Sequence, residues 1–203
     1  MKTLLKNCWN RIGKSDMNRL KNHSVYMVGS MDSDREAGAQ WRDEMTPFLQ
    51  SLGLRVINPY TKPLCQFSND PKTLEDDTNF GKIQTSLKNK NYDLAKDLVK
   101  QLRATDLRFV DTSHILLVYL DFDQLLTGTL EEIVTANRQK KPVIIKTSVP
   151  KNQMPHWYFG MLPHELFFET WNEVKEYLTH INSAPKIDDL DGRWVFFDQE
   201  FYA

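Results

Sequence analysis

The chain has 203 residues, of which 40% are hydrophobic and 26% are charged, a length that suits one well-packed domain and is short for two. Its 26 Lys and Arg residues nearly cancel its 27 Asp and Glu residues, so no overall basic field exists to hold a nucleic-acid polymer. The sequence also lacks an apolar run of the roughly 18 residues that a membrane span requires, which argues against a membrane partner.

The two ends of the chain carry little functional signal. Residues 1 to 23 contain scattered basic side chains without the apolar core of a secretory signal, which indicates a cytoplasmic protein that begins with a short helix or arm. Cys8 and Cys65 are the only cysteines, and we expect both thiols to stay unpaired in a reducing compartment. We expect the folded domain to span residues 24 to 182, and a C-terminal extension to cover residues 183 to 203.

From Ser24 onward, apolar runs alternate with helical patterns. Short runs rich in β-branched residues predict strands, at 24 to 30, 54 to 59, 114 to 121, 142 to 148 and 164 to 168. Apolar side chains at intervals of three and four residues predict helices, at 35 to 53, from about Gln84 to beyond Leu102, at 130 to 140 and at 169 to 181. Residues 60 to 80 are rich in Pro, Asp and Asn, which predicts a long loop within an insertion of about residues 60 to 95.

Alternating strands and helices, with strands that are apolar throughout, predict a parallel sheet covered on both faces. The expected fold class is therefore α/β, a single domain with a doubly wound, mostly parallel five-stranded sheet of the flavodoxin-like or Rossmann-like kind. In such folds ligands bind beyond the carboxyl ends of the strands. Polar or small residues follow three of the predicted strands at that edge and are candidates for substrate binding: Gly29, Ser30, Asn58, Asp121, Asp123, Gly128 and Thr129.

The stretch LLTGTLEEI, residues 125 to 133, opens the helix after the third strand. Thr129 and Glu132 have the spacing of a capping box, in which both side chains satisfy backbone N–H groups. The same position also suits a catalytic group, because the helix dipole stabilises a carboxylate in the first turn and this turn borders the ligand crevice. Glu131 points about 100° away on a helix, and we expect it to be a solvated neighbour. Glu132 thus has two open interpretations, a helix cap or a carboxylate nucleophile.

A nucleophilic carboxylate indicates glycosyl chemistry. The carboxylate attacks an anomeric carbon, and a second carboxyl group protonates the leaving group. The candidates for this second group are Asp106, Asp111, Asp121 and Asp123.

Three segments together are similar to a known enzyme family. TDLRFVDTSHILLVYLD, residues 105 to 121, followed by GTLEEIVTANRQKKPV, residues 128 to 143, resembles the nucleoside 2-deoxyribosyltransferases. VYMVGSMD, residues 25 to 32, resembles the first strand of that family and its Gly-Ser turn. The likeness covers roughly residues 24 to 148, and it lies in the order and spacing of the segments.

The resemblance implies roles for individual residues. Glu132 would be the nucleophile at C1′ of a deoxyribosyl group, Asp106 the acid/base near the departing base, and Tyr26 the group that orients the Glu132 carboxylate through its hydroxyl. Asp123 would contact the sugar hydroxyls. The resemblance further implies a homo-oligomer that acts on a small-molecule nucleoside or nucleotide and a free base. One position departs from the family, because Leu126 replaces an Asp that usually lies six residues before the nucleophile and contributes to sugar recognition.

Other functions fit some of the same residues. Gly29, Ser30, Arg35 and Arg42, in VGSMDSDREAGAQWR, resemble the opening of the nucleoside 5′-monophosphate N-glycosidases, in which Ser30 and Arg35 would bind a phosphate. GTLEE resembles the end of the cytokinin-type phosphoribohydrolase motif, although LLT replaces the additional glycines of that motif. A nucleotide-binding module without activity is a third alternative, and the departure at Leu126 motivates it.

We expect no cofactor and no metal site. The sequence contains no P-loop, no dinucleotide glycine fingerprint and no G-x-S-x-G elbow. His156 and His164 lack the companion Cys or His residues of a zinc site. The aromatic segments HWYFGMLPHELFF and RWVFFDQEFYA, residues 156 to 168 and 193 to 203, are expected to be core or homodimer contacts, and a surface that binds another protein is the alternative.

Overall fold

Five parallel strands form one sheet in the computed structural model, which describes residues 17–29, 35–60 and 76–196, except for the side chains of 35–37 and 76–80. The order across the sheet is β2-β1-β3-β4-β5, and all neighbouring strands are parallel. This is the flavodoxin-like order of a doubly wound sheet, and it confirms the predicted fold class. The strands are β1 (Ser24–Gly29), β2 (Arg55–Ile57), β3 (Ile115–Leu120), β4 (Val143–Thr147) and β5 (Phe167–Phe168).

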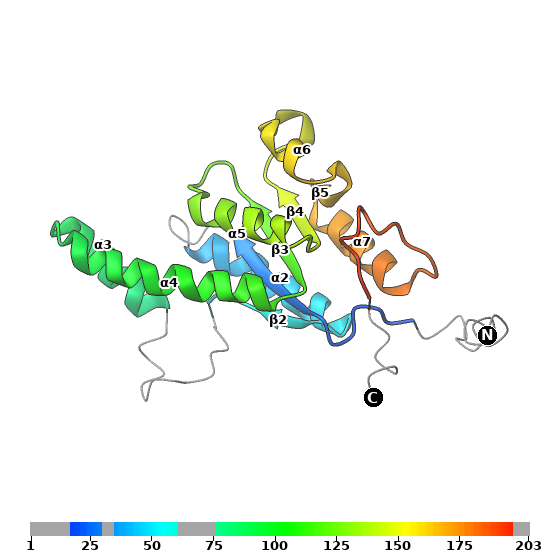
Figure 1. Ribbon diagram of the computed structural model, residues 1–203, viewed down its shortest axis with the longest axis horizontal. Coiled ribbons are helices and arrows are strands. Elements are labelled where there is room, and N and C mark those ends of the chain that lie inside the picture. The colour runs from blue at the N-terminus through cyan, green and yellow to red at the C-terminus, as the bar shows by residue number, and fades with distance from the viewer. Residues whose placement is uncertain (1–16, 30–34, 61–75, 197–203) are drawn as a thin grey trace.

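Helices cover both faces of the sheet (Figure 1). Val25 and Met27 of β1 point to the face covered by α2 and α7, whereas Tyr26 and Val28 point to the face covered by α4 and α5. Because side chains alternate along a strand, each strand contributes to both halves of the core. The helices are α2 (Arg35–Ser51), α3 (Asp76–Lys88), α4 (Tyr92–Thr112), α5 (Thr127–Arg138), α6 (Trp157–Met161) and α7 (Trp171–Ser183), with short 3₁₀ helices at Lys151–Gln153 and His164–Leu166.

The helices α3 and α4 form a hairpin that extends beyond one edge of the sheet (Figure 1). The sequence predicted a single helix from about Gln84, and that prediction was incomplete, because the structure has two helices with a turn between them. Lys90, in the turn, has a positive φ of 56°. Of the predicted loop at 60 to 80, residues 61–75 lie outside the described part of the chain and 76–80 are helical.

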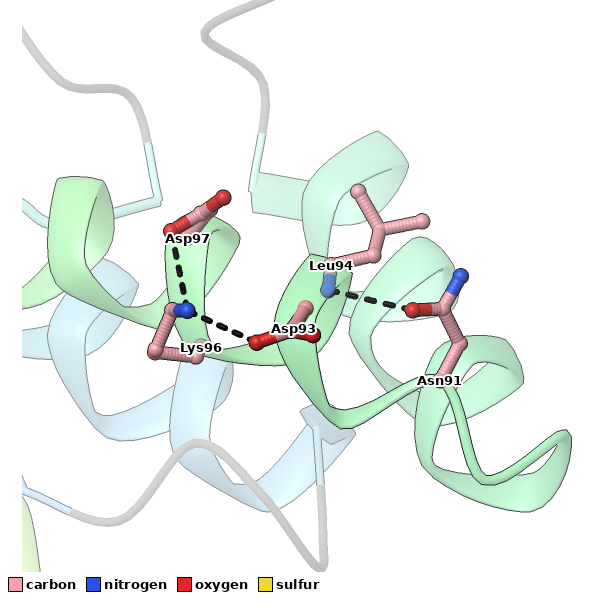
Figure 2. A network of polar contacts seen from close by, with 5 residues as sticks. All are labelled: Asn91, Asp93, Leu94, Lys96 and Asp97. Carbon is pink, nitrogen blue, oxygen red and sulfur yellow. Dashed lines mark hydrogen bonds and ion pairs between the residues drawn. The ribbon is translucent and has the colours of Figure 1, made fainter.

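The start of α4 is fixed by its own side chains (Figure 2). Asn91 caps the helix, and its Oδ1 atom accepts a hydrogen bond from Leu94 N at 3.2 Å. Lys96 Nζ lies 2.8 Å from a carboxylate oxygen of Asp93 and 4.0 Å from one of Asp97. A polar side chain that satisfies an N–H group of the first turn favours starting a new helix at this point.

The fifth strand is shorter than predicted. Only Phe167 and Phe168 pair with β4, because the three preceding residues form a 3₁₀ helix. The helix after it begins with a capping box, in which Glu173 N donates to Thr170 Oγ1 at 3.2 Å and Thr170 N donates to Glu173 Oε2 at 2.8 Å.

Residues on both sides of the predicted domain contribute to its core. Leu20 is fully buried, and Trp194 Nε1 donates to Tyr177 Oη at 2.8 Å. The predicted boundaries at 24 and 182 stay predictions, and Cys8 and Cys65 lie outside the described residues. Of the helices in the described ranges, none is long and apolar enough to cross a bilayer.

Two glycines with left-handed backbone allow a test of the packing at the end of α2. Gly53 has φ +78°, and a Cβ atom there would lie 3.0 Å from Lys21 Cα, whereas Gly192 has φ +76° and no heavy atom within 4 Å of such a Cβ. Gly192→Ala should lower the free energy of unfolding by about 1–2 kcal/mol, the cost of a left-handed alanine. Gly53→Ala should lower it further, because the Lys21 backbone must also move. Urea denaturation measures both, and equal losses would contradict the steric argument.

Candidate active site

A cavity of about 540 Å³ lies at the carboxyl end of β1, between the α3–α4 hairpin and the first turns of α5. Its volume is within the range of roughly 300–1,000 Å³ that is usual for small-molecule sites. Its position beyond the carboxyl ends of parallel strands is where ligands bind in this fold. The predicted site residues that line it are Tyr26, Gly29, Asp106, Gly128, Thr129 and Glu132.

A hydrogen bond between Tyr26 and Glu132 lies at the inner end of this cavity. Tyr26 Oη donates to Glu132 Oε1 at 2.8 Å, and the two side chains are 2% and 9% exposed. Tyr26 points toward α5 because side chains alternate along β1. Glu132 belongs to the buried face of α5, which also carries Thr129, Ile133 and Ala136. The periodicities of one strand and one helix therefore bring the two groups together.

Burial and the charges around Tyr26 keep its hydroxyl protonated. Burial raises the pKa of Tyr26 well above its usual value, and the nearby negative charges of Glu132 and Asp106 raise it further, while the positive charge of Arg42 acts in the opposite direction. A protonated phenol is the form that donates to a carboxylate. The pair is therefore set with Tyr26 as the donor and Glu132 as the acceptor.

The interpretation of Glu132 as a helix cap is wrong. The helix α5 begins at Thr127 with Leu126 as its N-cap residue, and no side chain caps it. Leu130 N already donates to Leu126 O at 2.8 Å, so helical hydrogen bonding starts before Thr129. Glu132 is therefore in the second turn and not in the first, and its carboxylate bonds to Tyr26 instead of to the backbone of Thr129.

Asp106 reaches the cavity from α4. It is half-buried, its Oδ1 atom is buried, and its negative charge acts on Tyr26. The helix continues to Thr112, so Asp106 lies within α4. Asp111, one of the alternative carboxyl groups, is exposed and accepts a hydrogen bond from Gln139 Nε2 at 2.7 Å.

An ion pair joins α4 to α5 beside Asp106 and Glu132. Arg103 Nε donates to Glu131 Oε2 at 2.8 Å, and Arg103 Nη2 donates to Glu131 Oε1. The hydrogen bond from Arg103 lowers the pKa of Glu131. Sequence reasoning expected Glu131 to be solvated, and its side chain is 40% exposed. It did not predict the partner, which lies 28 residues away.

Arg42 closes the cavity at the end of β1. Its side chain is fully buried, and its guanidinium donates to the carbonyl oxygens of Met27 at 3.4 Å, Gly38 at 2.6 Å and Gly29 at 3.1 Å. Gly29 permits this arrangement, since a Cβ there would lie 3.0 Å from Tyr119 O and 3.5 Å from Arg42 Nη2. Arg42 therefore fixes the backbone that borders the cavity.

Some predicted site residues lie elsewhere. Asn58, Asp121 and Asp123 do not line this cavity in the described part of the chain. Asn58 Oδ1 accepts from Tyr60 N at 3.0 Å, and Asp121 Oδ1 accepts from Asp123 N at 3.2 Å, so these side chains form local turns. Ser30 and the side chain of Arg35 are outside the described residues. Leu126, at the position of the family's Asp, packs against the hydrophobic core.

Sequence reasoning missed the apolar wall of the cavity. The α3–α4 hairpin and Leu125, in the loop before α5, supply it. The signal was the spacing of apolar residues by three and four positions along both helices. The wall consists of Ile83, Leu87, Val99, Leu102, Leu107 and Leu125.

A second cavity, of about 510 Å³, lies at the opposite end of the strands. His23, Asp111, His114, Lys141 and Arg193 are among the residues that line it, and none of the predicted catalytic residues is. It borders the amino ends of the strands, which is not where ligands bind in this fold. In neither cavity do the described residues include a group of three or more His, Cys, Asp or Glu side chains that could hold a metal ion.

The chain was compared with known proteins. No protein-family model matches it, and no curated protein matches it in sequence. Among solved structures, a 2-deoxyribosyltransferase from the psychrotolerant bacterium Bacillus psychrosaccharolyticus is similar to it with a TM-score of 0.46 and 16% sequence identity, over 76% of this chain and 91% of that chain.

The coupling between Tyr26 and Glu132 is measurable. Glu132→Gln should lower the pKa of Tyr26 relative to the wild type, because it removes a negative charge that raises this pKa. Glu131→Gln is the matched control and should leave the pKa of Tyr26 unchanged, since Glu131 pairs with Arg103. Alkaline titration of ¹³C-labelled tyrosine by NMR reports both.

The same titration has a consequence for stability. The pKa of Tyr26 is higher in the folded chain than in the unfolded chain, where it is about 10. The contribution of Tyr26 to stability is therefore fully present below the unfolded-state pKa of about 10, and it is lost as the pH rises through the folded-state pKa.

In the NMR titration, an unchanged pKa of Tyr26 in Glu132→Gln would contradict the hydrogen-bonded pair.

Proposed function

We propose that this protein cleaves the N-glycosidic bond of deoxyribonucleosides or deoxyribonucleotides and transfers the deoxyribosyl group to another base. The observation that carries the proposal is the buried hydrogen bond from Tyr26 to Glu132, in a cavity that Asp106 also lines. Two acids beside one cavity are what glycosyl transfer through a covalent intermediate requires.

Glu132 acts as the nucleophile. Tyr26 orients the carboxylate by donating to Oε1, and the carboxylate forms a bond with C1′ of the sugar as the bond from C1′ to the base breaks. The electron pair of that bond goes to the base nitrogen, which takes a proton from Asp106. The products of this step are a glycosyl ester on Glu132 and a neutral free base.

The second step reverses the first with a different base. The Asp106 carboxylate removes a proton from the incoming base, the base nitrogen attacks C1′, and the Glu132 carboxylate leaves. Two displacements at the same carbon retain its configuration. If water replaces the base in this step, the product is the free sugar and the enzyme is a hydrolase.

The lining of the cavity supports transfer. Its α3–α4 side carries a cluster of apolar side chains beside Gln84, Arg103 and Asp106, and such an apolar cluster favours a planar base over water at the position next to C1′. Tyr26, Asp106 and Glu132, the residues that the sequence resemblance singles out, line this same cavity although they come from β1, α4 and α5. Agreement between the sequence motif and the geometry supports the assignment of roles.

The proposal is tested with purified protein, each of the deoxynucleosides and deoxynucleotides, and a different free base. We expect base exchange in the wild type and a loss of about 10³-fold or more in Glu132→Gln, as is usual when a nucleophile is removed. The adjacent Glu131→Gln is the control and should retain exchange, because the Glu131 carboxylate is paired with Arg103 and does not bond to Tyr26. Chromatography of the bases measures the result.

Each other outcome of this assay has a meaning. Release of free base without exchange would assign a hydrolase that uses the same intermediate. No turnover of any substrate by the wild type would favour the nucleotide-binding module. Full activity of Glu132→Gln would exclude Glu132 as the nucleophile.

The role of Tyr26 has its own test. Tyr26→Phe removes only the hydroxyl that donates to Glu132, and a hydrogen bond to a charged group contributes about 1.5–3 kcal/mol. We expect kcat to fall roughly 10- to 100-fold with little change in KM, because the bond orients the nucleophile and does not contact the base. Steady-state kinetics give both constants, and a change confined to KM would assign Tyr26 to substrate binding instead.

A further inference from the structure

The outer part of the cavity is an apolar surface that is partly open. Leu87 on α3 is 50% exposed, Val99 on α4 is 42% exposed, and Leu125 before α5 is 77% exposed. Single exposed apolar side chains are common on protein surfaces, but several around one cavity indicate a binding surface. These three residues belong to three different elements, so the surface surrounds the opening of the cavity.

The charged groups of the lining do not favour a charged ligand on this surface. The described lining residues include two cationic side chains. Arg42 donates to three carbonyl oxygens, and Arg103 forms an ion pair with Glu131. The remaining charged groups there are the two acids of the proposed reaction. A neutral group on the ligand therefore fits the outer part of the cavity better than an anionic one.

The helix α4 sets how far the apolar surface extends from the reaction centre. Four lining residues of α4 are spaced by three or four positions and therefore lie on one face of the helix: Val99, Leu102, Arg103 and Asp106. Seven residues separate Val99 from Asp106, which is about 10 Å along the helix axis at 1.5 Å per residue. A base placed beside Asp106 therefore leaves Val99 uncovered unless it carries a substituent.

We propose that the leaving base of the substrate carries a bulky, uncharged, apolar substituent, and that this substituent packs against Leu87, Val99, Leu102 and Leu125. The proposal rests on the proposed function, since it places the base beside Asp106. It deepens that function by assigning the α3–α4 hairpin to selection of the base. The hairpin then determines which substrates are used, while β1 and α5 carry the reaction.

The test compares matched pairs of donors that differ only in the substituent. The pairs are 2′-deoxyadenosine with its N6-benzyl derivative and 2′-deoxyuridine with its 5-benzyl derivative, so that purine and pyrimidine sites are both covered. We expect kcat/KM to be at least about tenfold higher for the substituted member of one pair, the size of effect that a small apolar group gives in a complementary pocket. A ratio near one, or below one, in both pairs would overturn the proposal.

Two variants show whether the hairpin is responsible. Leu87→Asn should bring the ratio of the preferred pair close to one. Leu94→Asn is the matched control, because Leu94 is 47% exposed on α4 and does not line the cavity, and it should leave the ratio unchanged. If Leu87→Asn lowers the melting temperature but leaves the ratio of the two kcat/KM values unchanged, Leu87 packs against the protein itself and not against the substituent.

A binding measurement separates this inference from the proposed function. Calorimetric titration of the wild type with adenine, N6-benzyladenine, uracil and 5-benzyluracil requires no turnover. Tighter binding of a benzylated base, weakened in Leu87→Asn, supports the apolar surface even if no donor is cleaved, in which case the proposed function alone fails. Turnover of the unsubstituted donors without any benzyl preference in rate or binding would overturn the inference alone.

Discussion

A buried carboxylate is stable only where a donor compensates for the loss of water, and the hydrogen bond from Tyr26 to Glu132 meets this requirement at the centre of the site. The bond depends on β1 being an interior strand, since β2 and β3 flank it and hold its register. It depends equally on the buried face of α5, where Glu132 shares its row with Ile133 and Ala136. The proposed reaction centre is thus part of the hydrophobic core.

The end of β1 shows a similar balance between charge and packing. Arg42 is fully buried, and three backbone carbonyl oxygens take the place of water around its guanidinium. The rings of Trp41 and Tyr60 lie 4.6 and 5.3 Å from it, which adds cation–π attraction. Because two of the carbonyls belong to Met27 and Gly29, the same contacts hold the strand end that borders the cavity.

The elements that could be predicted from the sequence are those that a local pattern of residues specifies. Continuous apolar runs identified β1, β3 and β4, because a strand buried on both faces needs no polar side. The start of α5 could not be predicted, since Thr127 and Thr129 both suit a helix start and the packing of Leu126 against the core decides between them. The capping box occurs instead at Thr170, with the same spacing. The pairing of Arg103 with Glu131 depends on how two helices pack, which no single segment specifies.

The α3–α4 hairpin has a different relation to the rest of the domain than the other elements do. α3 packs chiefly against α4, and its Leu87 is half exposed, so a substitution there leaves the sheet intact. A substitution at Tyr26 or Glu132 alters the core itself. The fold therefore separates the proposed reaction centre, where substitutions disturb the core, from the proposed selectivity surface on the hairpin, and related proteins with different substrates should differ first along this hairpin.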